Sequence, residues 1–121
     1  MPARERIEAL VFCVEAGKYV EAIEEFYAED ASMQENLQAP RKGRKGLVDG
    51  ERKLLAAHKA VRTLPGTWYL ADGDRVVIRW LFEFTTQDGQ VRRMEELAHQ
   101  RWQGDRIVEE RFYYDPVQMR G

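Results

Sequence analysis

The chain has 121 residues, of which 44% are hydrophobic and 11% aromatic, and its formal net charge at pH 7 is −2. This size and composition predict a single domain spanning residues 1–121 with a core of its own. The charge gives no basic field for nucleic acid or an anionic membrane, and no stretch approaches the roughly 20 apolar residues of a membrane helix. With Cys13 as its one cysteine and no signal-peptide pattern at the N-terminus, the chain is expected to be cytoplasmic.

The first half of the chain is predicted to be mainly helical, with a short extended segment at residues 32–37 that carries Glu35. Residues 3–16 carry apolar side chains at helical spacing and end at Gly17, and a second short helix follows that turns Phe26 or Tyr27 inward. A third helix is expected over about residues 46–59, where Gly50 weakens the helix but allows close packing against another element. The four cations of the loop before it could bind a phosphate, but without a P-loop pattern a solvated basic loop is the favoured interpretation.

The second half is predicted to form strands. Residues 61–71 form one strand interrupted at Leu64-Pro65-Gly66, and proline restricts such a strand to an edge or a bulge. Three further strands, 76–86, 91–102 and 106–115, are joined by short turns rich in glycine and aspartate, as in an antiparallel meander. Helices followed by strands predict an α+β domain with helices on one face of a curved sheet.

Three segments resemble the SnoaL-like branch of the nuclear transport factor 2-like superfamily: FYAEDA at 26–31, PRKG at 40–43 and RFYYDP at 111–116. The order of elements is similar from about Ile7 to Asp115. The resemblance implies a cystatin-like α+β fold, a cone-shaped half-barrel whose curved antiparallel sheet wraps around N-terminal helices. It also implies a pocket closed by those helices and frequent dimerisation through the outer sheet face. Members include ketosteroid isomerases, polyketide cyclases, dehydratases, epoxide hydrolases and non-catalytic proteins, so the fold does not fix the function.

Period-two alternation predicts which side chains would face such a pocket. Trp80, Phe82 and Phe84 share one face of the central strand with Val76 and Ile78. On the following strands the same parity turns inward Met94, Glu96, Ala98 and Gln100, and then Val108, Glu110, Phe112 and Tyr114. We therefore predict a substrate-binding surface made of Trp80, Phe82, Phe84, Met94, Phe112, Tyr114 and Tyr27.

Three glutamates are the predicted catalytic residues. Glu96 and Glu110 would lie among rings on adjacent strands, where desolvation raises the pKa of a carboxyl group. Glu35 matches the position of the proton-shuttling aspartate of the ketosteroid isomerases. Ala98 takes the place of that family's second aspartate, however, and the first helix has no tyrosine donor. Steroid isomerisation by that mechanism is therefore not expected, although Tyr27 or Tyr114 could serve as donors.

Several of the polar residues also allow a purely structural role. The glutamates could be plain buried pairs with Arg92 or Arg106. His58 and His99 suggest no metal site, His58 is expected to be a surface or helix-capping residue, and Asp115 before Pro116 is expected in a turn. Cys13 is interpreted as a small buried hydrophobic residue.

Taken together, the residues and the resemblance predict a cofactor-free isomerase, cyclase or dehydratase acting on a small hydrophobic carbonyl compound. The alternative is a non-catalytic small-molecule-binding or dimerisation module of the same fold. The outward face of the sheet alternates Arg and Glu and carries Leu81, Leu97 and Tyr113, which favours a homodimer over an ordinary solvated face.

Overall fold

The structure is a computed structural model that describes residues 1–120. Its helices are α1 (Arg4–Glu15), α2 (Tyr19–Phe26), α3 (Arg44–Ala56) and the short 3-10 helix η1 (Pro116–Met119). Its strands are β1 (Tyr27–Glu35), β2 (Arg41–Lys42), β3 (Ala60–Thr63), β4 (Trp68–Asp72), β5 (Arg75–Thr85), β6 (Val91–Gln103) and β7 (Arg106–Tyr113). No helix within residues 1–120 is long and apolar enough to cross a membrane.

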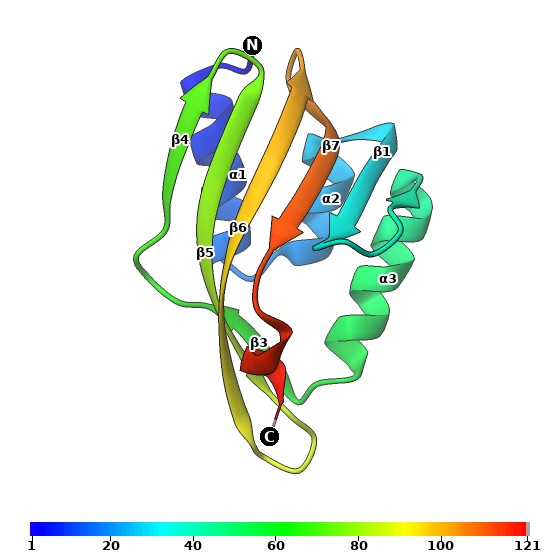
Figure 1. The fold of residues 1–121 in the computed structure, drawn as a ribbon, viewed down its shortest axis with the longest axis vertical. Helices are drawn as coiled ribbons and strands as arrows, with labels where there is room; N and C mark the ends of the chain where they lie inside the picture. The colour runs from blue at the N-terminus through cyan, green and yellow to red at the C-terminus, as the bar shows by residue number, and fades with distance from the viewer. Residues whose placement is uncertain (121) are drawn as a thin grey trace.

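The strands form one sheet in the order β2-β1-β7-β6-β5-β3, with β4 also paired to β5. All pairings are antiparallel except that of β1 with β7. In Figure 1, α1 and α2 lie behind one face of the curved sheet, while α3 runs beside β1. The predicted α+β class and the helix-covered curved sheet are confirmed.

β3 and β4 lie along the same edge of β5. Thr63 is opposite Phe82 and Trp68 is opposite Arg79, so the four residues 64–67 bridge a gap of two residues on β5. Pro65 falls in this interruption, where its missing N–H leaves no gap in the ladder. The prediction of a single interrupted edge strand is confirmed.

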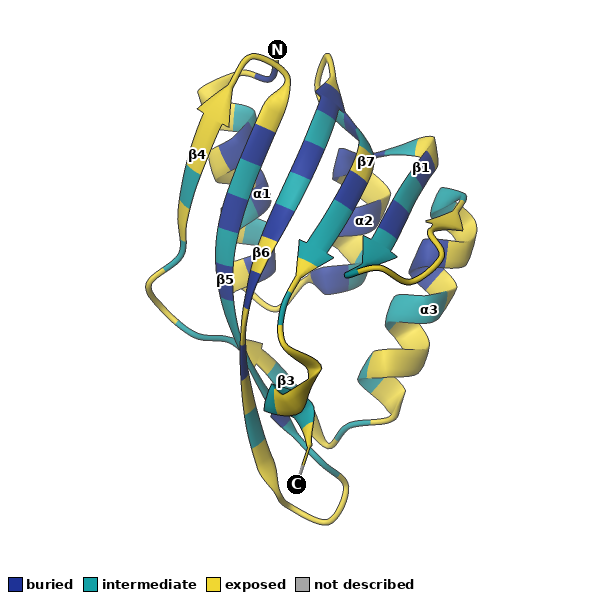
Figure 2. Ribbon diagram, in the orientation of Figure 1, coloured by how far each residue is buried: buried dark blue, intermediate teal, exposed yellow. Residues whose placement is uncertain are grey.

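The inner face of the sheet follows the predicted parity on β5 and β6. Val76, Ile78 and Trp80 are almost fully buried, as are Ala98 and Gln100 on β6. Figure 2 shows the resulting alternation of buried and more exposed residues along these strands. This face packs against the apolar stripes of α1 and α2, which together with it form the hydrophobic core.

The predicted parity is wrong at the start of β7. A register shift lies between Arg101 and Trp102, because Arg101 is opposite Glu109 whereas Trp102 is opposite Ile107. The extra residue is Val108, which the alternation placed inward and which is only half-buried. Ile107 takes its place in the core, because a bulge of one residue reverses the alternation beyond it.

The third helix begins and ends earlier than predicted, at Arg44 and Ala56 instead of about 46 and 59. Gly43 precedes it with a φ of +96° that a side chain would strain. Beyond its end, the Nδ1 atom of His58 lies 2.8 Å from the Leu54 carbonyl oxygen, which confirms the expected capping role. Asp115 likewise confirms its expected turn role by accepting a hydrogen bond from the Val117 N–H at the start of η1.

Cross-strand ion pairs cover the outer face of the sheet. Arg79 pairs with Glu95 at 2.8 Å, and Arg101 pairs with Glu109 at 2.6 Å. Glu83 forms ion pairs with two arginines, Arg62 on β3 and Arg93 on β6. The predicted alternation of charges is therefore realised within one chain, and these ion pairs hold neighbouring strands together.

Candidate functional site

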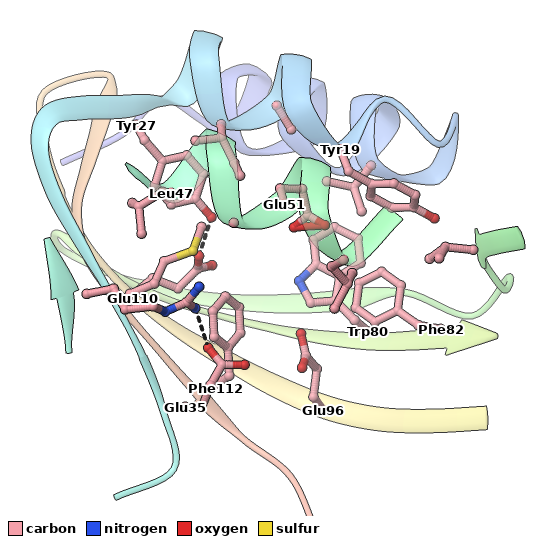
Figure 3. A pocket seen from close by; sticks show the side chains of 18 of the residues that line it. Tyr19, Tyr27, Glu35, Leu47, Glu51, Trp80, Phe82, Glu96, Glu110 and Phe112 are labelled. Carbon is pink, nitrogen blue, oxygen red and sulfur yellow. Dashed lines mark hydrogen bonds and ion pairs between the residues drawn. The ribbon is translucent and has the colours of Figure 1, made fainter. Parts of the chain in front are cut away.

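A cavity of about 440 Å³ lies between the helices and the inner face of the sheet. Side chains from α1, α2, α3 and six strands of the sheet line it, and Figure 3 shows how they converge. The predicted site residues that line it are Tyr27, Glu35, Trp80, Phe82, Phe84, Met94, Glu96, Glu110 and Phe112. Tyr114 is the exception, because its side chain contacts Glu35 but does not line the cavity.

Aromatic rings form one wall of the cavity. The rings of Trp80 and Phe82 stack with centroids 5.8 Å apart, and Tyr19 meets Phe82 edge-on at 6.1 Å. The period-two spacing of β5 brings Trp80, Phe82 and Phe84 to one face. Their combined surface is suited to a flat apolar ligand.

Glu110 lies in the middle of a buried hydrogen-bond chain. The Tyr27 hydroxyl donates to Oε1 of Glu110, and Nε2 of Gln100 donates to Oε2 at 2.7 Å. Trp102 in turn donates from Nε1 to Oε1 of Gln100 at 3.0 Å. Burial raises the pKa of Glu110 to about 7, although the two donors favour its ionised form and lower that pKa.

Glu96 is buried without such support. Its exposed fraction is 6%, and within residues 1–120 no side chain donates a hydrogen bond to its carboxyl group or forms an ion pair with it. Burial, and secondarily the negative charge of Glu110, raise the pKa of Glu96 well above its ordinary value. A raised pKa favours the neutral, protonated form of a carboxyl group, which can donate a proton into the cavity.

Glu35 stands at the end of β1 in a different environment. Arg41 donates from Nη2 to its Oε2 at 2.7 Å, and the Tyr114 hydroxyl donates to its Oε1 at 3.3 Å. Burial and the charge of Glu35 raise the pKa of Tyr114 to about 12, so this hydroxyl remains a donor. An arginine partner at this distance is typical of an ionised carboxylate.

The suggested pairing of these glutamates with Arg92 or Arg106 is wrong. Within residues 1–120, neither Glu96 nor Glu110 has an arginine partner, and Nη2 of Arg92 donates to the side chain of Gln90. The interpretation of the basic loop as merely solvated is also incomplete, because Arg41 lines the cavity. β2 pairs Arg41 with Met33 of β1 and so carries its guanidinium to Glu35.

Sequence reasoning missed a fourth acid, Glu51 of α3, which lines the cavity opposite the sheet. Burial raises the pKa of Glu51, and the charge of Arg41 opposes that shift. The sequence did contain a signal: Glu51 follows Leu47 by four residues and precedes Leu54 by three, so it falls within the apolar stripe of its helix. No group of His, Cys, Asp and Glu among residues 1–120 is arranged to hold a metal ion.

Two carboxyl groups in different states thus face one apolar cavity. Glu35 has a cationic partner, whereas Glu96 has none and is desolvated. Different environments for neighbouring acids are the usual means by which one carboxyl serves as base and another as acid. The arrangement is therefore capable of proton transfer on a bound molecule.

Comparisons with known proteins agree with this architecture. A SnoaL-like polyketide cyclase candidate from Mesorhizobium loti superposes with a TM-score of 0.75 at 21% identity, covering 91% of this chain and 97% of its own. A polyketide cyclase candidate from Xanthomonas campestris gives 0.81 at 17% identity, with 96% and 95% covered. TerC, co-crystallised with polyporic acid, gives 0.78 at 18% identity, with 94% of both chains covered.

Other similar structures are described as nuclear transport factor 2-like proteins or as having a cystatin-like fold, in agreement with the curved sheet and its helices. A search among curated proteins gave no match. Residues 7–110 match the family model of the SnoaL-like domain, which is most of the chain. The protein therefore belongs to the SnoaL-like domain family.

Proposed function

We propose that this protein is a cofactor-free isomerase, cyclase or dehydratase that acts on a small hydrophobic carbonyl compound. The observation that carries this proposal is the unpartnered, buried carboxyl of Glu96, which faces the same apolar cavity as the arginine-paired Glu35. A buried polar group without a partner costs folding free energy. A ligand that accepts its hydrogen bond would recover part of that cost.

Glu35 is assigned as the general base and Glu96 as the general acid. Glu35 takes a proton from the carbon next to the carbonyl group, and the electron pair of that C–H bond forms a C=C bond. The carbonyl π electrons move to the oxygen, to which protonated Glu96 donates. One donor aimed at a developing oxyanion is worth roughly 3 kcal/mol of barrier. Return of the proton to another carbon, or loss of a leaving group, then completes an isomerisation or an elimination.

Glu110 is assigned a supporting role. Both of its carboxylate oxygens accept hydrogen bonds from protein groups, from Tyr27 and from Gln100. The carboxylate of Glu110 therefore has fewer free hydrogen-bonding positions for a ligand than that of Glu96. Its two hydrogen bonds also fix the ring of Tyr27 and the amide of Gln100 at the wall of the cavity. The ring wall of Trp80, Phe82 and Phe84 would bind the apolar body of the substrate.

The relatives support a small-molecule site of this kind. Two of them are cyclase candidates, and TerC was co-crystallised with polyporic acid.

Proton abstraction can be tested without knowing the natural substrate. We expect the protein to catalyse deuterium incorporation next to the carbonyl of 1-tetralone in D₂O, followed by proton NMR. Glu35→Gln and Glu96→Gln should each slow this exchange by about 100-fold, the usual contribution of a positioned acid or base. Glu21→Gln, which removes an exposed glutamate of α2 that does not line the cavity, is the matched control and should leave the rate unchanged.

Exchange that persists at the wild-type rate in both Gln variants would rule out the assigned base and acid. No exchange with the wild-type protein, across a set of bicyclic ketones that bind in calorimetry, would point to the alternative function.

That alternative is a non-catalytic small-molecule-binding module. One observation favours it: two of the donors best placed to stabilise an oxyanion are already engaged, the Tyr27 hydroxyl with Glu110 and Arg41 with Glu35. Binding of a bicyclic ketone without any turnover or exchange would support it.

The outer sheet face is proposed to form a homodimer. Leu97 and Tyr113 lie directly opposite each other on β6 and β7 and remain 38% and 40% exposed. The surrounding charges are already paired within the chain. Two copies could therefore meet around this apolar pair without strong repulsion between like charges.

A further inference from the structure

The charges that line the cavity are strongly unbalanced. Four glutamates contribute to its wall, Glu35, Glu51, Glu96 and Glu110, against the single guanidinium of Arg41. That guanidinium is already bound to Glu35. The remaining acids of the lining have no cationic partner among residues 1–120.

Two of these acids also lack hydrogen-bond donors. Within residues 1–120, neither Glu51 nor Glu96 accepts a hydrogen bond from any side chain, and Glu96 is more than nine-tenths buried. They enter the cavity from opposite sides, Glu51 from α3 and Glu96 from β6 (Figure 3). Burial is the main cause of the raised pKa of Glu96, and the charge of Glu51 is the last of the smaller causes.

This environment discriminates among ligand charges. An anionic group would have to compete with Glu35 for Arg41, the single cation of the lining. A positively charged group would allow Glu51 to ionise inside the protein, because opposite charges within a few ångströms favour the charged form. The stacked rings of Trp80 and Phe82 offer an apolar surface for the rest of such a ligand.

We propose that the ligand carries a positively charged amine on a hydrophobic body, and that Glu51 is the counter-ion that recognises the ammonium group. The amine lies on the α3 side of the cavity, and the apolar body lies against Trp80 and Phe82. This inference rests on the proposed function for the use of the cavity as a ligand site, and it adds the substrate class: a hydrophobic carbonyl compound that bears an amine. Glu96 then remains available to the carbonyl oxygen.

Three ligands of the same shape but different charge test this inference. Calorimetry at pH 7 would compare 1-naphthylmethylamine, 1-naphthalenemethanol and 1-naphthoate, which are respectively cationic, neutral and anionic. We expect the amine to bind at least about 10-fold more tightly than the alcohol, and the naphthoate to bind most weakly. Equal affinities for amine and alcohol, or no detectable binding of the amine, would overturn the inference.

The Glu51→Gln variant tests the assigned residue. It should weaken amine binding by about 10-fold while leaving the affinity for the alcohol within about two-fold, because the amide keeps the shape and removes the charge. Glu21→Gln is again the matched control and should leave both affinities unchanged. Equal loss of amine and alcohol affinity in Glu51→Gln would indicate that Glu51 shapes the cavity and does not recognise charge.

The two proposals can fail separately. If 1-tetralone undergoes exchange but the amine has no advantage over the alcohol, the acid–base function stands and the amine class is wrong. If the amine is preferred and Glu51-dependent but no ketone undergoes exchange, the cavity is an amine-binding site without the proposed catalysis.

Discussion

At the residue scale, the cavity holds carboxyl groups of the same chemical type in different states. Glu35 has a guanidinium partner, Glu110 accepts two hydrogen bonds, and Glu96 has neither kind of support. These differences come from neighbours that are distant in sequence, such as Tyr27 and Gln100 around Glu110. Since the surroundings and not the residue type set the pKa, each acid contributes differently to the pH dependence of stability.

Glu110 should make the protein less stable as the pH rises from about 5 to about 8. Its pKa is about 7 when folded against 4.5 as the reference value, so in this window the folded state binds a proton that the unfolded state has released. Stability therefore falls with pH until the folded carboxyl has also ionised, by on the order of 3 kcal/mol for such a shift. Urea unfolding followed by circular dichroism at several pH values in this range measures the effect.

The Glu110→Gln variant isolates this contribution. Glu96 and Glu51 have raised pKa values and add slopes of the same sign, so the variant should flatten the wild-type dependence without abolishing it. Glu109→Gln removes the neighbouring, exposed glutamate of the same strand and should not reduce the decline between pH 5 and 8. A variant at 110 that keeps the full wild-type slope would show that the buried carboxyl is ionised throughout.

At the element scale, the alternation along β5 and β6 was enough to predict most of the cavity wall. It placed Trp80, Phe82 and Phe84 on one face and turned Met94 and Glu96 the same way, as the structure shows. A strand has only two faces, so one correct assignment orients all its residues. Alternation could not predict the bulge opposite Trp102, which depends on how two strands pair and not on either sequence alone.

The partners of the acids could not be predicted for a related reason. Tyr27 and Glu110 are 83 residues apart, and they meet because β1 lies parallel to β7 at the sheet edge. Arg41 reaches Glu35 through the two-residue strand β2, which is too short to leave a periodic pattern. Glu51, by contrast, could have been found, because an acid within the apolar stripe of α3 marks a polar group that faces the interior.

Gly50 of α3 lies next to the side chain of Arg41. A Cβ at Gly50 would lie 3.4 Å from Nη1 of Arg41 and has no closer neighbour. The expected close approach of another element at Gly50 is thus confirmed, but one methyl group fits. Gly50→Ala should therefore raise the free energy of unfolding by about 0.5–1 kcal/mol, because alanine favours the helix interior.

Gly43 provides the contrast on the same helix. Its φ of +96° disfavours any side chain, so Gly43→Ala should destabilise the fold by about 1–2 kcal/mol even though the space around it is open. Urea denaturation of both variants separates the two effects. A loss of stability in Gly50→Ala would mean that the Arg41 guanidinium cannot shift by a few tenths of an ångström.

At the scale of the whole molecule, the sheet divides the chemistry between its two faces. The inner face carries the rings and the unpaired acids of the cavity, whereas the outer face carries ion pairs that already satisfy one another. Exposed ion pairs contribute little stability individually. Their effect at this scale is to leave an outer surface of nearly balanced charge around a small apolar centre.

If that apolar centre is a dimer contact, a charge placed there should separate the subunits. We expect the wild-type chain to sediment as a dimer, and Leu97→Glu or Tyr113→Glu to sediment as monomers, because a two-fold contact would place each new carboxylate near its own copy. Leu37→Glu introduces the same charge at an exposed leucine in the turn after β1 and should remain dimeric. Sedimentation velocity across a concentration series gives both readouts, and the 1-tetralone exchange rate reports whether the cavity survives in the monomer. A wild-type chain that is monomeric at every concentration would contradict the dimer proposal. The outer face would then be an ordinary solvated surface whose ion pairs act only within one sheet.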